Sequence, residues 1–400
     1  MAKNGFKIID SELHLEEPFD LWEKRLPDSY RARTKLIEPP GGHLDTGQVK
    51  IQLGDRFSPK RSRAQRSSDG DESGSLVFRQ GNRRWEHSPK ELMAARTNCS
   101  PETYIAGMDI EGIDVAILTP SLGFHIMNID GVEPGHALAL CRAYNDYAAE
   151  FAGENPGRFK FWGWLPRQAP DLAAEEARRC VEDLGAVGVA MTHAGVDGTI
   201  LSDEIFDPLW AEIDRLDTSL GLHVTGITAL ADDVAARYSG HRRTEVISST
   251  MSHPFYAQTC LAELILGGVL ERYANMKVVI MESNSAWLPW LLWRMDEKWE
   301  TYGPDQEYTL SLKPSEYFRR QCYAVADPGE EVVKYAIDYV GADRLLWSSD
   351  FPHHDSPFPE ASNHFMALEG VSEESKRKIL WDNGAKLYGL AAPSSVTASS

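Results

Sequence analysis

Short apolar runs alternate with longer stretches of helical spacing along most of this chain, and this alternation limits the folds that it can adopt. The apolar runs are Phe6–Asp10, Asp114–Pro120, Phe159–Leu165, Ala186–Met191, Leu220–Gly226, Met276–Ser283 and Leu345–Trp347. The stretches with helical spacing are His136–Phe151, Pro170–Leu184, Phe206–Leu216, Tyr256–Tyr273, Trp287–Trp299 and Lys376–Leu387. Strands separated by helices of about 10–16 residues are typical of βα units and a parallel sheet. With roughly seven or eight such units, the sequence predicts a (β/α)8 TIM barrel rather than an open doubly wound sheet. No GxGxxG motif follows the first strand to indicate a dinucleotide site.

One region departs from this alternation. Residues 41–100 include Phe57–Gly74, which is polar, charged and rich in Ser and Gly. Such a composition predicts a partly flexible insertion after the first strand, and insertions of this kind in barrel enzymes often form a lid or an interface. We therefore predict a single barrel domain over residues 1–390 that contains this insertion, followed by a disordered tail over residues 391–400.

The net charge limits the partners that this chain can bind, and the cysteine content indicates its compartment. The formal net charge of −19 disfavours nucleic acid or an anionic membrane surface, because both would be repelled. The five cysteines are widely spaced without a CxxC pair, as in reduced cytosolic proteins. The first residues are too polar for a signal peptide, and no apolar run is long enough to span a membrane. We expect a cytoplasmic protein that acts on a small molecule.

Side chains able to bind a metal recur where the apolar runs end. They are Glu12, His14, His193, His223, Glu282, Asp350, His353 and His354. The period of two in Glu12-x-His14 places both side chains on one face of a strand. A lone histidine at a strand end is usually structural, but all strand C-termini of a barrel meet at one face, so these residues become neighbours there. The pattern predicts a metal centre.

Carboxylates and imidazoles in an open site suit Zn, Mn or Fe, as one ion or two. Such an ion activates water, polarises a carbonyl or chelates a carboxylate-bearing substrate. His253, in Ser252–Phe255, has the ordinary pKa of a proton carrier near neutral pH, although it could equally be a capping or core histidine. His125 follows another strand and is expected to line the pocket.

Several motifs together resemble the amidohydrolase-2 (amidohydrolase-related) family, which includes aminocarboxymuconate-semialdehyde decarboxylase and the γ-resorcylate-type decarboxylases. The resemblance covers Ile8 to about Leu390. Its motifs are Ile9–Pro18, Met108–Asp114, Cys141–Asp146, Gly221–His223, Ser252–Phe255, Gly267–Arg272, Glu282–Pro289 and Ser349–His353. The resemblance implies a (β/α)8 barrel with Glu12, His14, His223 and Asp350 as ligands of a divalent metal. The ExH on the first strand resembles the decarboxylase pattern, whereas some members have HxH.

One motif differs from the family pattern. Where the aminocarboxymuconate branch has a catalytic histidine, this chain has Glu282-Ser283-Asn284. Glu12, Glu282 and Asp350, together with His14, His223 and His253, offer more ligands than one ion needs. This ligand balance resembles that of dinuclear iron or manganese oxygenases in the family, which hydroxylate small amines or amino acids as paired subunits.

The sequence thus supports three hypotheses. The first is a metal-dependent hydrolase or decarboxylase acting on a small carboxylated or amide-bearing molecule, with catalytic roles for His253, Glu282 and His353. The second is the dinuclear oxygenase. The third is a non-catalytic, metal-binding partner subunit. We expect a homo-oligomer, or a hetero-oligomer with a related barrel subunit, and we assign pocket or second-metal roles to His125, His193 and His354.

Overall fold

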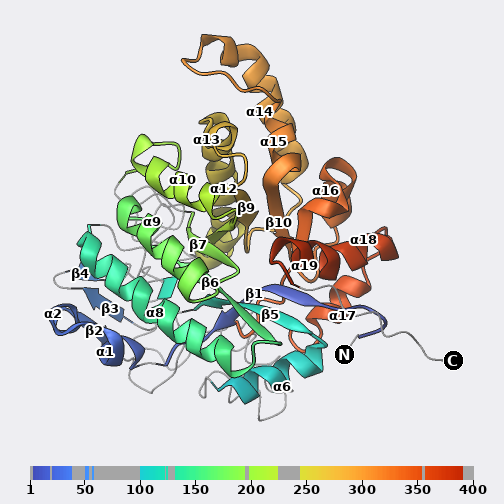
Figure 1. Ribbon diagram of the computed structural model, residues 1–400. Helices are drawn as coiled ribbons and strands as arrows, with labels where there is room; N and C mark the ends of the chain where they lie inside the picture. The colour runs from blue at the N-terminus through green and yellow to red at the C-terminus, as the bar shows by residue number, and fades with distance from the viewer. Residues whose placement is uncertain are drawn as a thin grey trace.

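The computed structural model describes residues 3–18, 20–37, 50–53, 56–57, 100–121, 123–124, 131–193, 198–223, 244–353 and 356–390. Within these ranges, eight strands form one sheet in which every hydrogen-bonded pair is parallel (Figure 1). In sheet order they are β1 (Ile9–Leu15), β5 (Val115–Pro120), β6 (Phe159–Trp164), β7 (Gly188–Thr192), β8 (Ser219–His223), β9 (Lys277–Ile280), β10 (Cys322–Ala326) and β11 (Leu345–Trp347). Sheet order follows chain order and the sheet curls into a nearly closed barrel, which confirms the predicted (β/α)8 TIM barrel.

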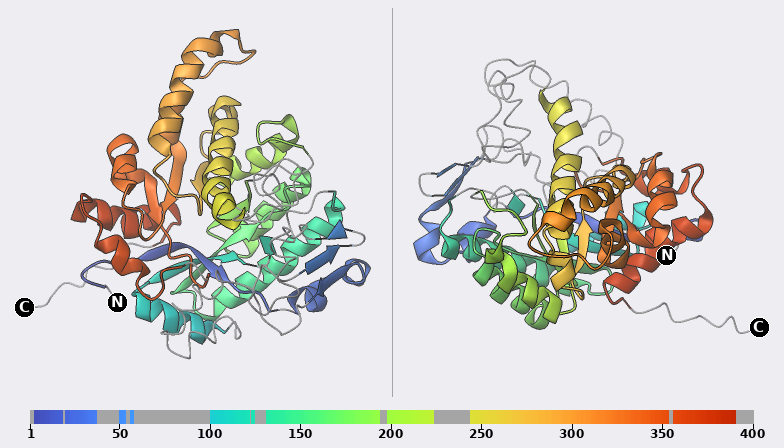
Figure 2. Two further views of the ribbon diagram at one scale, coloured as in Figure 1. Left: turned by 180° about the vertical axis from the view of Figure 1, so that it is seen from behind. Right: turned by 90° about the horizontal axis from the view of Figure 1, so that it is seen from above.

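Helices follow the strands and cover the outside of the sheet (Figures 1 and 2). The main ones are α6 (Pro101–Glu111), α8 (Pro134–Glu154), α9 (Pro170–Arg178), α10 (Asp207–Arg215), α12 (Thr244–Leu266), α13 (Val269–Arg272), α14 (Leu288–Tyr302), α15 (Pro314–Gln321) and α16 (Val333–Val340). Shorter helices are α1 (Leu21–Arg25), α2 (Asp28–Arg31), α17 (Ala361–Met366), α18 (Glu373–Arg377) and α19 (Asn383–Leu387). Two π-helical turns, Arg179–Asp183 and Lys378–Asp382, extend α9 and α18, and 3-10 turns cover Glu204–Phe206, Gly303–Asp305 and Ala342–Arg344. The packed pair α14 and α15 extends away from the barrel.

The core explains why the strands appear as continuous apolar runs. All residues of β5, β7, β8 and β10 are buried, because the strands lie between the barrel interior and the helical layer. Large side chains such as Trp162, Trp164 and Trp347 are completely buried. Burying one such large apolar side chain contributes about 1.5–3 kcal/mol, and these strands supply most of the core.

Two strand predictions need correction. The first strand does not end at Asp10 but continues to Leu15, so Glu12 and His14 lie within β1. Polar side chains interrupt the apolar run there, yet all seven residues of β1 are buried. The sequence analysis also missed β10, because its five residues, Cys-Tyr-Ala-Val-Ala, follow a helix directly and form only a short apolar run.

The predicted insertion over residues 41–100 lies mostly outside the described residues. The described parts include β3 (Lys50–Leu53) and β4 (Arg56–Phe57), which join β2 (Thr34–Ile37) in a small antiparallel sheet. Phe57, which was assigned to the polar loop, therefore belongs to a strand. The predicted tail over residues 391–400 also falls outside the described ranges. Among the described helices, none combines the length and apolarity needed to cross a membrane.

Candidate metal centre

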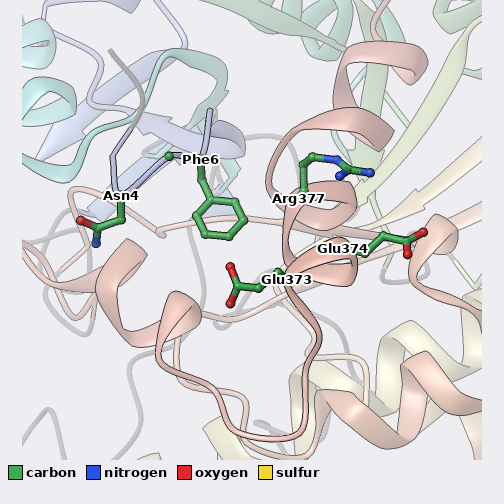
Figure 3. Close-up of a pocket in the computed structure, with 6 residues that line it drawn as sticks. Asn4, Phe6, Glu373, Glu374 and Arg377 are labelled. Atoms are coloured by element: carbon green, nitrogen blue, oxygen red, sulfur yellow. The ribbon is translucent and has the colours of Figure 1, made fainter.

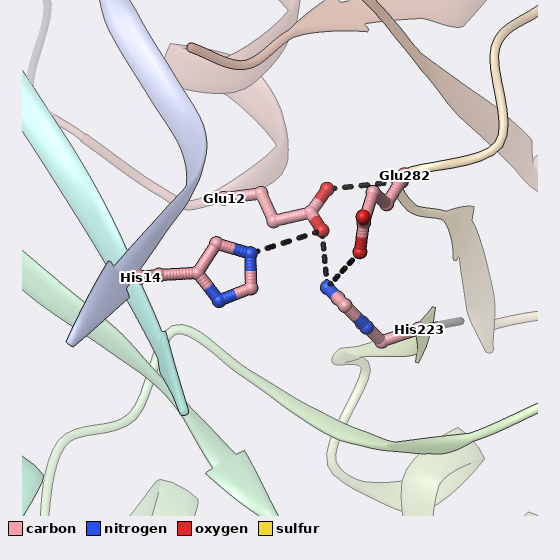
Figure 4. Close-up of side chains that lie close together, drawn as sticks. All are labelled: Glu12, His14, His223 and Glu282. Atoms are coloured by element: carbon pink, nitrogen blue, oxygen red, sulfur yellow. Dashed lines mark hydrogen bonds and ion pairs between the residues drawn. The ribbon is translucent and has the colours of Figure 1, made fainter. Parts of the chain in front are cut away.

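Four of the predicted residues meet at the C-terminal mouth of the barrel (Figure 4). One ligand atom from each lies within 4.8 Å of the others, and the residues are Glu12, His14, His223 and Glu282. A second group of ligand atoms with the same spacing shares His14 and adds Asp350 and His353. Because β1 and β8 place their last residues at the same face as the turns after β9 and β11, residues far apart in the sequence become neighbours there.

The bulged first strand supplies two of these side chains. The register of β1 against β5 shifts between Asp10 and Leu13, and Glu12 lies within this irregularity. Nδ1 of His14 lies 2.9 Å from the carbonyl oxygen of Pro120. That oxygen can only accept a hydrogen bond, so Nδ1 carries the proton and Nε2 presents its lone pair to the cluster. An imidazole fixed in this way by its other nitrogen is typical of a metal ligand.

Glu12 lies at the centre of the first group. Its Oε1 is 4.0 Å from Nε2 of His14 and in close contact with Nε2 of His223. Its Oε2 accepts a hydrogen bond of 3.1 Å from the backbone N–H of Glu282. Glu12, His14 and His223 are each at most 1% exposed. A buried carboxylate is costly unless a positive charge compensates it.

Asp350 approaches the same nitrogen of His14 that Glu12 faces. Its Oδ1 lies 3.2 Å from Nε2 of His14 and 2.8 Å from Nδ1 of His353. The rings of His14 and His353 stack with centroids 3.8 Å apart. His353 therefore lies beside His14 and Asp350.

Burial and neighbouring groups shift the pKa values of His14, Glu12 and Asp350. Burial lowers the pKa of His14 to about 4, so its ring is neutral at pH 7. Burial raises the pKa of Glu12. For Asp350, burial alone would raise the pKa, but the nearby His353 imidazole and the contact with His14 hold it well below its ordinary value.

These donors pass a simple test of fit for a divalent metal. Glu12 Oε1, His14 Nε2 and Asp350 Oδ1 are buried and make no hydrogen bond of acceptable geometry within the described residues. Oxygens of two carboxylates, Glu12 and Asp350, thus lie near the lone pair of one imidazole nitrogen. A divalent cation would satisfy all three, since carboxylate and imidazole are ligands that Zn, Mn and Fe share.

Glu282 and His253 link the buried part of the cluster to its more exposed outer part. Oε2 of Glu282 lies 3.2 Å from Nε2 of His223, and its Oε1 lies 3.8 Å from Nδ1 of His253 on α12. The side chains of Glu282 and His253 are about one quarter exposed, at 22% and 24%. This pair therefore connects the buried ligands to the outer part of the site.

Backbone strain gathers at the same place. Glu282, Asn284 and Asp350 have φ values of +43°, +57° and +58°, in the left-handed region that residues other than glycine rarely adopt. Such conformations persist where surrounding contacts hold them, and they concentrate at functional sites.

The remaining predicted residues have different outcomes. His193 is buried at the end of β7, where its backbone N–H bonds to the carbonyl of His223 and its ring lies against Tyr256. Burial lowers its pKa well below the ordinary value. It belongs to neither group of ligand atoms among the described residues. His125 and His354 lie outside the described part of the chain.

Sequence reasoning missed two features beside the cluster. Phe124 stacks on His223 with ring centroids 4.0 Å apart and meets His14 edge-on, so it forms an apolar wall next to both rings. Asp327 follows β10 and accepts a hydrogen bond from Asn284. The pKa of Asp327 is raised to about 8, mainly by burial and secondly by the negative charge of Glu330. A carboxylate directly after an apolar run was the available signal for Asp327, but its strand had not been identified.

A hollow of about 420 Å³ lies elsewhere (Figure 3). It is lined by Asn4, Gly5, Phe6, Glu373, Glu374 and Arg377. Asn4 to Phe6 precede β1, which places the hollow at the N-terminal face of the barrel, opposite the candidate metal ligands. In TIM barrels that face serves stability rather than catalysis. We assign it no functional role.

Comparison with known proteins finds amidohydrolases and decarboxylases. The model of the family Amidohydro_2, described as amidohydrolase, matches residues 9–390. A γ-resorcylate decarboxylase from Polaromonas sp. is 28% identical over 294 residues, which are 71% of this chain and 85% of that protein. The crystal structure of an amidohydrolase from Mycobacterium avium subsp. paratuberculosis covers 97% of this chain and 99% of its own, with a TM-score of 0.72 and 22% identity. A dihydroxybenzoic acid decarboxylase from Polaromonas sp., solved with manganese and the inhibitor 2-nitroresorcinol, covers 96% of this chain and 97% of its own, with a TM-score of 0.62 and 21% identity.

Proposed function

The chain belongs to the amidohydrolase family, as its sequence motifs predicted, and on this premise we propose that it is a metal-dependent decarboxylase acting on a small carboxylated aromatic compound. It is an enzyme of the amidohydrolase superfamily. The observation that carries the proposal is the convergence of Glu12, His14, His223 and Asp350 at the barrel mouth, with mutually facing donor atoms. The activity follows the γ-resorcylate decarboxylase that the chain resembles over most of its length.

We assign the metal to these four residues. Their donors suit a divalent ion, and the dihydroxybenzoic acid decarboxylase of the same fold was solved with manganese. When bound, such an ion supplies Lewis-acid stabilisation of negative charge on substrate oxygens. Asp350 has a lowered pKa, so it serves as an ionised ligand rather than as the acid that donates a proton.

The remaining chemistry requires a proton at the right place. When the carbon–carbon bond to the carboxylate breaks, CO2 leaves and the electron pair stays on the ring carbon, which must then take up a proton. Glu282 and His253, 3.8 Å apart and about one quarter exposed, can hold that proton and replace it from solvent. In our proposal, His353 orients the Asp350 carboxylate through its 2.8 Å contact.

Phe124 supports an aromatic substrate. Its ring covers His223 and borders His14, and Trp164 packs against it with centroids 4.8 Å apart. An apolar wall beside the donors excludes water and favours a flat, hydrophobic ring. Hydrolysis of an amide at the same donors was equally expected from the sequence, but the aromatic wall and the decarboxylase relatives favour loss of CO2.

A direct assay tests the proposal. Metal-stripped protein is reloaded with Mn²⁺ or Zn²⁺ and incubated with a panel of hydroxybenzoates, each labelled with ¹³C at the carboxylate. We expect labelled CO2 from at least one compound, dependent on metal, and its loss in D350N. Asp338 is exposed on α16, so D338N is the matched control and should keep full activity. Metal-independent turnover, or full turnover by D350N, would overturn the proposal.

One observation favours a second candidate, a dinuclear oxygenase. Two groups of ligand atoms share His14, and Glu282 occupies the first group in a place where a mononuclear site needs no further carboxylate. In this reading Glu282 binds a second ion instead of carrying a proton. Two metals per chain and substrate-dependent oxygen consumption would favour it, whereas one metal and turnover without oxygen would exclude it.

We also propose that the chain works as an oligomer. Trp290 and Trp293, three residues apart on α14, are more than half exposed at 57% and 51%. Exposed tryptophans on one helix face are typical of an interface. The partner is a second copy or a related barrel subunit. If the isolated chain binds metal but converts no substrate until a related subunit is added, the non-catalytic alternative takes precedence.

A further inference from the structure

Three of the four proposed ligands lie on β1 or shortly after β11, and these two strands do not pair with each other in the sheet within the described ranges. β1 and β11 are the first and last strands in the sheet order, and within the described ranges no ladder pairing joins them. They nevertheless pack against each other. Glu12 and His14 lie on β1, and Asp350 follows β11 by three residues. The distance between these ligands is therefore set by contacts other than a regular ladder.

One such contact passes through the hydroxyl of Ser348. Its Oγ donates a hydrogen bond of 3.0 Å to the carbonyl oxygen of Glu12 and accepts one of 3.1 Å from the backbone N–H of Asp350. A single buried hydroxyl thus joins the main chains of two proposed ligands.

A second contact passes through Ser349 and Asp10. The Ser349 hydroxyl donates to Oδ2 of Asp10, and the Ser349 backbone N–H donates to the same oxygen at 3.2 Å. The hydroxyl also accepts a hydrogen bond of 3.1 Å from the N–H of Phe351. The other oxygen of Asp10, Oδ1, accepts the N–H of Glu12 at 3.1 Å. Asp10 and Ser349 are completely buried, so water does not replace these bonds.

Backbone geometry shows what these contacts hold in place. Asp350 has a φ of +58°, which a residue with a Cβ adopts only when its surroundings enforce it. The residues on either side of it are both tied to β1, Ser349 to Asp10 and Phe351 through its carbonyl to the N–H of His14 at 2.8 Å. The direction of the Asp350 side chain therefore depends on bonds to β1.

We propose that Asp10, Ser348 and Ser349, the seam residues, position Asp350 against Glu12 and His14 and thereby set the affinity and geometry of the metal site. They are positioning residues, because none of them offers an atom to the groups of ligand atoms found in the described structure. The inference rests on the ligand set of the proposed function. Residues that orient ligands in this way commonly change metal affinity by roughly 10- to 100-fold when they are replaced.

The test compares S349A and D10N with S362A. Ser362 is an equally buried serine whose hydroxyl bonds to Glu111 at the end of α6, on the opposite face of the barrel. Mn²⁺ affinity is measured by competition with a chelating dye, and the visible absorption of Co²⁺-loaded protein reports the coordination geometry. We expect a dissociation constant raised roughly 10- to 100-fold in S349A and D10N, with a changed Co²⁺ spectrum. S362A should keep the wild-type affinity and spectrum.

The results for the variants separate a positioning role of the seam residues from a general loss of stability. If D10N fails to fold, S349A carries the test, because it removes one hydroxyl and leaves the Asp10 carboxylate in place. Wild-type affinity and an unchanged spectrum in folded S349A would overturn the role of the seam residues. An equal loss in S362A would also overturn it, since the effect would then reflect general destabilisation. If the wild-type protein itself binds no Mn²⁺, the proposed metal site fails instead.

Discussion

Oε2 of Glu282 lies 3.2 Å from Nε2 of His223, so a carboxylate from the turn after β9 reaches the centre of the barrel mouth. Its backbone N–H also binds Glu12, and its φ of +43° shows that the turn is held in place. Glu282 is therefore part of the cluster that could hold a metal ion, and its role decides between the two candidate functions.

Replacing Glu282 separates these roles. If Glu282 carries a proton, E282Q should bind the metal as tightly as the wild type but lose roughly 100-fold or more in kcat, which is the usual contribution of a general acid. If it is a ligand, metal content should fall instead. Metal analysis and kcat measured on the same sample distinguish the outcomes, and E300Q on the exposed end of α14 is the control. Unchanged kcat and unchanged metal content would remove Glu282 from both candidate functions.

Metal binding should release a proton. Burial raises the pKa of Glu12, so the metal-free protein holds a proton there near neutral pH, whereas His14, with a pKa of about 4, is already neutral. A cation binds only the ionised carboxylate, so the affinity should fall as the pH falls. Calorimetry at pH 7 in two buffers of different ionisation enthalpy should give about one proton released per metal bound. Identical heats in both buffers would contradict the raised pKa.

The strand ends and their convergence were predictable because they depend on local pattern. Buried parallel strands appear as apolar runs, and the period of two in Glu12-x-His14 fixed a shared face. His223 and Asp350 followed from the same rule. Contacts between distant side chains were not predictable in this way. The bonds from Asp10 to Ser349 join residues 339 positions apart and leave no periodic signal.

Two further omissions have physical causes. Residue types associated with metals drew attention to His125, which lies outside the described residues, and not to its neighbour Phe124, which forms the observed wall against His223. The short strand β10 lacks bulky β-branched residues apart from Val325, so both the strand and the Asp327 that follows it were missed.

Packing between β6 and its helix predicts a stability difference between two glycines. A methyl group at Gly163 would lie 2.5 Å from Cβ of Cys180, so G163A should destabilise the protein by about 1–3 kcal/mol through overpacking. Gly153 lies exposed in α8 with no atom within 4 Å of such a methyl, so G153A should stabilise by about 0.5–1 kcal/mol. Urea denaturation of both variants measures the difference. A G163A protein as stable as the wild type would show that β6 and the turn at Cys180 are packed less closely than the structure indicates.

The exposed tryptophans of α14 predict self-association or association with a related subunit. The double variant W290E/W293E should lower the molar mass measured by light scattering, because charges at a buried interface are strongly unfavourable. K298Q, on the same helix, should leave the mass unchanged. A wild-type chain that is monomeric both alone and with its candidate partner would remove this prediction.

Anomalous diffraction from crystals soaked in Mn²⁺ would show where this protein binds a metal. We predict a strong peak at the barrel mouth, within coordination distance of Glu12, His14, His223 and Asp350. A second peak at Glu282 would favour the dinuclear candidate. No peak at these side chains, or a peak only elsewhere on the molecule, would show that these residues do not form a metal site.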